Sequence, residues 1–151
     1  MAPSLTLALV LALSAVVGQS TRSAPPRIQF LAPDEFPLDA GCAGLPVGDS
    51  RVVLACGSEF AAVKIDGAVL RLTPSEGSEF PGAGERRGDR IRQKWTSGVV
   101  SVLLDLVLES DCPPDEECDG SVRSGDLTVK VGNGAGAAAQ KTIRIQIDCG
   151  C

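Results

Sequence analysis

The chain of 151 residues contains no histidine and no tyrosine, and it has one tryptophan and four phenylalanines. Without histidine, Ser-His-Asp and Cys-His catalysis is impossible within this chain. Zinc is also not expected, because the cysteine spacings are C-x5-C and C-x-C rather than CxxC. Acidic residues are plentiful, but no pair stands out as a candidate for glycoside hydrolysis. We therefore predict a protein that is not an enzyme and that uses no cofactor and no metal.

Charge narrows the range of partners. Lysine and arginine total 14 against 19 aspartates and glutamates, which gives a formal net charge of −5. An acidic surface argues against nucleic acids and anionic membranes as partners, and it favours basic ones. The other reading is that the net charge only keeps the protein soluble.

The N-terminus has the pattern of a signal peptide. The uncharged apolar run Leu5–Val17 is too short to span a bilayer, which takes roughly 20 residues. Small residues follow it, so cleavage is expected near Gly18–Ser20. No later hydrophobic run is long enough for a membrane span. We predict a signal peptide over residues 1–20 and a protein that is secreted or periplasmic.

Export to an oxidising compartment makes every cysteine a disulfide candidate. Cys112 and Cys118 enclose a proline-stiffened loop that a local disulfide could close. Cys149 and Cys151 point the same way if a strand continues through them, so we expect them to bond elsewhere, and the two remaining cysteines are their candidate partners. The six candidates are Cys42, Cys56, Cys112, Cys118, Cys149 and Cys151.

The acidic loop over residues 111–119 raises the question of calcium. It offers several carboxylates, but it lacks the ligand order of the helix-loop-helix calcium site. A solvated loop is the simpler interpretation, and the sequence does not decide whether this loop binds calcium.

Short β-type runs separated by turn residues fill the chain from residue 49 onward. Asp66-Gly67 is the strongest hairpin signal, because a type I′ turn needs positive φ at both central positions. Val99–Leu108 suits a central strand better than a helix, although its Leu-Leu-Asp-Leu segment leaves some ambiguity. The predicted strands are Arg51–Cys56, Phe60–Ile65, Ala68–Leu72, Arg90–Trp95, Val99–Leu108, Leu127–Val131 and Lys141–Ile147.

The fold class that follows is all-β, a small antiparallel barrel, or a sandwich, of seven to eight short strands with disulfides. The domain covers residues 49–151. Residues 21–48 are rich in proline and glycine, and we predict an extended arm there that can donate one edge strand and is tied down by Cys42.

One stretch resembles a known family. It contains Ser75-Glu76-Gly77-Ser78, a glycine-rich loop, and then Trp95-Thr96-Ser97-Gly98 before an apolar strand. The order is similar to that of the membrane-bound and periplasmic inhibitors of c-type lysozyme. The resemblance implies a small exported antiparallel barrel stapled by a disulfide. It also implies that Ser75 or Ser78 is the loop serine that enters the lysozyme cleft.

The match to that family is partial. In the family a strand ends Trp-x-Lys-Gly, and its lysine also enters the cleft, whereas here Ser97 stands at the lysine position. The nearest lysine, Lys94, lies on the other side of Trp95, and Phe80 takes the place of the aromatic residue expected soon after the serine.

Together these patterns predict a non-catalytic binding module that acts through the Thr73–Gly88 loop and the nearby strand ends. The expected partner is a basic extracellular protein such as c-type lysozyme. The alternative is a structural secreted or envelope module without a discrete ligand site. The predicted partner-binding residues are Ser75, Ser78, Phe80, Lys94 and Ser97.

Overall fold

A computed structural model describes residues 24–57, 59–76, 86–110, 121–132 and 138–149. This part of the chain contains nine strands, one short 3₁₀ turn at Pro33–Glu35, and no α-helix. The strands are β1 (Ile28–Gln29), β2 (Cys42–Pro46), β3 (Leu54–Cys56), β4 (Ala61–Ile65), β5 (Ala68–Pro74), β6 (Arg90–Ser97), β7 (Val100–Leu108), β8 (Ser121–Val131) and β9 (Ala139–Cys149).

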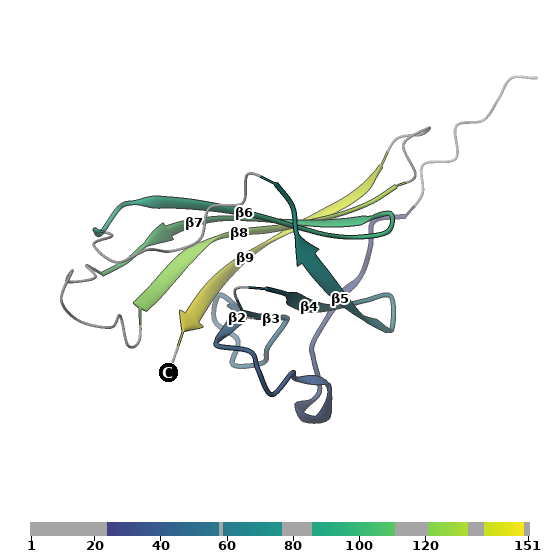
Figure 1. The fold of residues 1–151 in the computed structure, drawn as a ribbon, viewed down its shortest axis with the longest axis horizontal. Coiled ribbons are helices and arrows are strands. Elements are labelled where there is room, and N and C mark those ends of the chain that lie inside the picture. Colours follow the sequence, from purple (N-terminus) through teal and green to yellow (C-terminus); the bar gives the residue numbers. More distant parts are fainter. Residues whose placement is uncertain (1–23, 58, 77–85, 111–120, 133–137, 150–151) are drawn as a thin grey trace, which may run out of the picture.

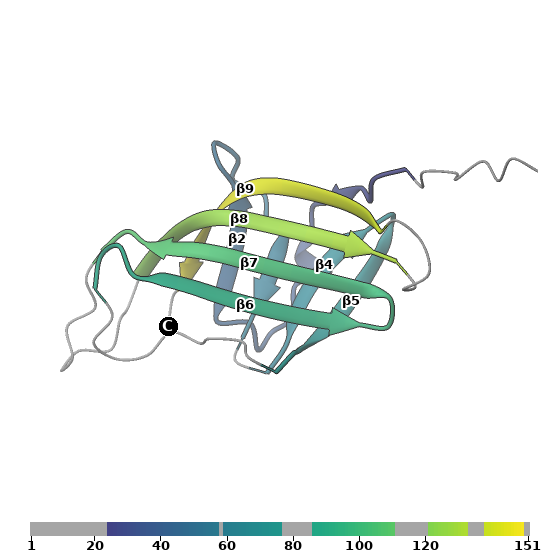
Figure 2. The same ribbon diagram turned by 90° about the horizontal axis from the view of Figure 1, so that it is seen from above.

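Eight of these strands close into an antiparallel barrel, which confirms the predicted fold class. Their order is β4-β3-β2-β9-β8-β7-β6-β5, and the pairing of β5 with β4 completes the circle. The long strands β6 to β9 form one curved layer over the shorter strands β2 to β5 (Figure 1; Figure 2). The ninth strand, β1, pairs with the end of β4.

The core follows from the period-two pattern of the strands. Every second residue of β7, from Val100 to Leu108, is buried, so this segment is the strand that its branched residues predict rather than a helix. Trp95 on β6 is fully buried, and the other largest buried side chains are valine, leucine and isoleucine. The scarcity of aromatic residues is therefore compensated by aliphatic packing.

The predicted Asp66-Gly67 hairpin forms, and the last two predicted strands pair with each other as a final hairpin. Asp66 and Gly67 have φ angles of 49° and 88°, as the turn between β4 and β5 requires. The final hairpin is longer than predicted. Residues 121–124, which precede the predicted strand Leu127–Val131, belong to β8, because Arg123 pairs with Leu108 on one side and Ile147 on the other.

The turn between β6 and β7 is also displaced from its predicted position. The sequence places it at residues 96–98, but β6 continues to Ser97, which pairs with Val100. The turn is therefore made by Gly98, with a φ of 55°, and Val99. In contrast, β3 starts three residues later than its predicted strand, at Leu54.

The N-terminal arm contributes two strands, and β2 is not at an edge. It lies between β3 and β9. Pro46 is tolerated at its end because β2 residues alternate in the side they face. The Gly44 carbonyl accepts a hydrogen bond from Val53, so Pro46, two residues on, also turns its nitrogen away from β9, and no ladder bond is lost.

A disulfide ties this arm to the C-terminal strand. Cys42 and Cys149 are register partners with a Cα–Cα distance of 4.1 Å and an S–S bond of 2.11 Å. Cys56 is opposite Cys42 on the other side, and because Cys42 is already bonded, Cys56 is a buried thiol. The prediction that Cys56 is a disulfide half is therefore wrong. The predicted signal peptide, the 111–119 loop and Cys112, Cys118 and Cys151 lie outside the described residues.

Candidate functional site

The predicted binding surface is partly assembled by the pairing of β5 with β6. The two strands share only two pairs, Thr73 with Thr96 and Pro74 with Trp95. Ser75 follows directly, and its N–H donates a hydrogen bond of 2.8 Å to the Lys94 carbonyl. Its hydroxyl lies 3.4 Å from the Thr96 hydroxyl. The structure therefore brings Ser75 and Lys94, separated along the chain, to adjacent positions.

The other predicted partner-binding residues are less informative. Ser97 is half-buried at the end of β6, where it pairs with Val100 at the turn into β7. Ser78 and Phe80 lie outside the described residues. Of the five predicted positions, only Ser75 and Lys94 are joined by a described contact.

The outer face of β6 is basic although the protein is acidic. Arg90, Arg92 and Lys94 alternate with buried residues and are all exposed. Asp105 on β7 accepts two hydrogen bonds from Arg90, at 2.5 and 2.6 Å, and lies 3.5 Å from the Arg92 guanidinium. The hydrogen-bonded Arg90 holds the pKa of Asp105 below its usual value. Asp105 is therefore engaged by two of the three cations of this face, Arg90 and Arg92.

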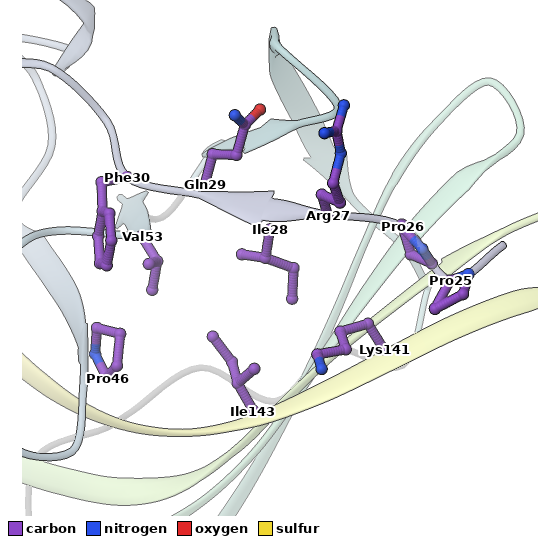
Figure 3. A pocket seen from close by; sticks show the side chains of 10 residues that line it. All are labelled: Pro25, Pro26, Arg27, Ile28, Gln29, Phe30, Pro46, Val53, Lys141 and Ile143. Atoms are coloured by element: carbon purple, nitrogen blue, oxygen red, sulfur yellow. The ribbon is translucent and has the colours of Figure 1, made fainter.

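A cavity of about 530 Å³ opens between β1 and β9, a size typical of ligand pockets. Figure 3 shows Ile28 from β1 and Ile143 from β9 pointing toward each other across it, while Arg27 and Gln29 point away. The lining is mainly apolar and includes one ammonium side chain, that of the exposed Lys141. The residues that form its walls include Ile28, Phe30, Pro46, Val53, Lys141 and Ile143.

A second cavity, of about 560 Å³, is also lined by Phe30. Arg51 stands over the Phe30 ring at 3.7 Å from its centroid and contacts Asp49 at 2.7 Å. Hydrogen bonding by Arg51 lowers the pKa of Asp49 to about 2. The one cation that lines this second cavity is thus already held by a carboxylate and a ring.

The sequence does not single out the residues of the first cavity. Ile28 belongs to the only apolar run of the arm, and Ile143 and Lys141 read as ordinary members of an alternating strand. The one sequence signal for this cavity is Pro46, because a proline ends β2 there while its partner strand β9 extends further. Its meaning depends on knowing that β2 and β9 are paired.

Among the described residues, no helix is long and apolar enough to cross a membrane, and no cluster of three or more histidine, cysteine or acidic side chains is suited to a metal ion. Comparison with protein families, characterised proteins and solved structures found no match to this chain. The fold itself defines the class, a small closed antiparallel β-barrel stapled by a disulfide.

Proposed function

We propose that this protein is an exported, non-catalytic binding module that acts through the surface where Ser75 meets β6. The observation that carries the proposal is the 2.8 Å hydrogen bond from Ser75 to the Lys94 carbonyl. It holds the start of the 75–89 connection against a strand whose outer face is basic. A residue anchored in this way loses less conformational entropy on binding than an unanchored one.

The most specific version of this proposal is inhibition of c-type lysozyme. The resemblance in the 75–98 stretch supports it, and so does the disulfide-stapled barrel, which the lysozyme inhibitors share. Lys94 is exposed on the outer face of β6. Its ammonium group is complementary in charge to the two carboxylates of a lysozyme cleft.

The test is inhibition of c-type lysozyme by the oxidised protein in a cell-wall lysis assay. We expect dose-dependent inhibition that the double variant Ser75→Ala/Ser78→Ala weakens at least about tenfold, as loss of central contacts does at other interfaces. Lys94→Glu should weaken it by a similar factor. Lys130→Glu, an equal charge change at an exposed position on β8, is the matched control and should have no effect.

Two outcomes would count against the proposal. If the protein neither inhibits nor binds lysozyme, the resemblance does not extend to function, and the structural module becomes the better reading. If the protein inhibits but all three variants inhibit equally well, the inhibitory surface lies elsewhere on the barrel.

A further inference from the structure

The wall of the barrel is incomplete between β1 and β9. β3 pairs with Ala61–Val63 of β4, and β1 pairs with the next two residues of β4. Both strands run antiparallel to β4, so β1 lies end to end with β3 along the same edge of β4. β2 fills the space between this line and β9 only as far as Pro46, which pairs with Ile145. Beyond Pro46 no described strand lies between β1 and β9, and the cavity of about 530 Å³ opens there (Figure 3).

Backbone groups of both flanking strands face this gap. Along a strand, successive residues turn their N–H and C=O to opposite sides. The Arg27 carbonyl accepts a 3.0 Å hydrogen bond from the residue that follows β4, so Arg27 faces β4 and Ile28 faces the gap. On β9 the Arg144 carbonyl accepts from Val47 at 3.2 Å, so Thr142, two residues earlier, faces the same side.

The groups that face the gap have no ladder partner there. The described pairs of β9 with β2 stop at Ile145, and β1 is paired with β4 alone. Unpaired strand edges are templates for the addition of another strand. A lipid tail or another apolar ligand would leave the donors and acceptors of Ile28 and Thr142 unsatisfied. A peptide backbone would satisfy them.

Side chains at the gap specify what such a peptide must carry. Lys141 and Ile143 share the inward face of β9 with the buried Ile145 and Ile147. Ile28 lies opposite Ile143 across the cavity, and the exposed Lys141 lies next to Ile143 toward the Pro25-Pro26 end (Figure 3). In the described part of the chain, no carboxylate forms an ion pair with Lys141. An incoming strand would place an apolar residue opposite Ile143 and, two residues on, an acidic residue opposite Lys141.

We propose that this gap binds an extended peptide of a partner protein, which adds a strand in line with β2 and antiparallel to β9. The recognised pattern is apolar-any-acidic, read along the direction of β2. Pro46 at one end and the Pro25-Pro26 pair at the other border the gap and limit the added strand to a few residues. The proposal uses none of the residues of the Ser75 surface, so it stands or falls separately from lysozyme inhibition.

The probe is a capped, fluorescently labelled pentapeptide of sequence Val-Thr-Glu-Thr-Lys, which starts opposite Ile143, beyond the Pro46–Ile145 pair; it is tested by fluorescence anisotropy with the full-length oxidised protein. We expect saturable binding that slows hydrogen exchange of the Ile28 and Thr142 amides at least tenfold in NMR spectra. Lys141→Glu should weaken binding about tenfold, as the reversal of one partly desolvated charge pair does. A peptide with lysine in place of glutamate should restore it. Lys130→Glu is the matched control and should bind like the unmodified protein.

A second peptide separates strand addition from simple burial of side chains. Methylation of the peptide nitrogens that face β9 removes hydrogen-bond donors and leaves the side chains in place, so it should abolish binding. The proposal is overturned if the methylated peptide binds equally well, or if no peptide binds up to its solubility limit. It is also overturned if dodecanoate binds in the gap and the peptide does not, or if the two amides are already protected by self-association without peptide.

Discussion

Cys56 shows how burial controls the chemistry of a single residue in this protein. Its side chain is 5% exposed, and burial raises the pKa of its thiol to about 12, with the nearby Arg123 charge acting in the opposite direction. Arg123 is itself buried, and its Nη1 lies 3.3 Å from the Cys149 sulfur. The thiol therefore stays protonated beside a disulfide that it could otherwise attack.

The first prediction concerns the reactivity of this thiol. Because the thiolate is the nucleophile, Cys56 in the folded protein should resist iodoacetamide at pH 8 and should react readily once guanidinium unfolds the chain. Peptide mapping by mass spectrometry measures the labelling at this position. Equal labelling of the folded and unfolded protein would show that the Cys56 thiol is accessible and ionisable in the barrel.

At the scale of the elements, the pairing of β7 with β8 includes a close backbone approach that depends on one glycine. Gly125 on β8 pairs with Leu106, and a Cβ added at Gly125 would overlap the Asp105 carbonyl oxygen and crowd the Leu106 Cα. These atoms belong to the backbone of a paired strand, so they cannot move aside as the end of a flexible side chain can. The absence of a side chain here lets β7 and β8 pair along the whole length of β7.

The second prediction follows from this contact. Gly125→Ala should lower the free energy of unfolding by about 1–3 kcal/mol or more, as overpacking of a filled interior does. Urea denaturation followed by the fluorescence of Trp95 measures the loss. Gly41→Ala is the matched control, because an added Cβ there meets nothing within 4 Å. Equal stability of the two variants would contradict the close approach of β7 and β8.

At the scale of the whole molecule, the barrel is closed by strand pairings of unequal length. β8 and β9 share eleven residue pairs, whereas β5 and β6 share two. The pairing of β2 with β9 joins the arm to the C-terminal strand. The Cys42–Cys149 disulfide links these two strands across a sequence separation of 107 residues. The covalent bond therefore links the strand pair with the largest separation along the chain.

The third prediction concerns this bond. The double variant Cys42→Ser/Cys149→Ser should unfold at a free energy lower by about 4–5 kcal/mol, the contribution of so long a loop in the loop-entropy model. Guanidinium denaturation of the variant and of the oxidised protein gives the difference. A difference close to zero would mean that the bond does not stabilise the folded protein. The pairing of β2 with β9 would then keep these segments together without the bond, in the folded or in the unfolded chain.

The local parts of the fold were accessible from the sequence. Alternation of apolar and polar residues predicts β7, and Asp66-Gly67 predicts the β4–β5 turn, because both signals act between residues close in the chain. Strand ends were less accurate. Ser97 and residues 121–124 belong to strands because of partners on neighbouring strands, and a local pattern does not contain that information.

The site depended still more on distant pairings. The sequence identified Ser75 and Lys94 as candidates, but only the register of β5 on β6 places them together. The cavity between β1 and β9 had no signal of its own, since Ile28 and Ile143 meet only after β2 ends at Pro46.

By itself, the amino-acid sequence determined that this chain forms short antiparallel strands with an aliphatic core, because side-chain period and turn chemistry are local properties. Tertiary structure alone decided that the strands close into a barrel, that Cys42 bonds Cys149 rather than Cys56, and that a gap remains between β1 and β9. Each of these depends on the register between segments far apart in the chain. That register is set by the packing of the whole core, because a shift of one residue would turn every side chain of a strand to the wrong face.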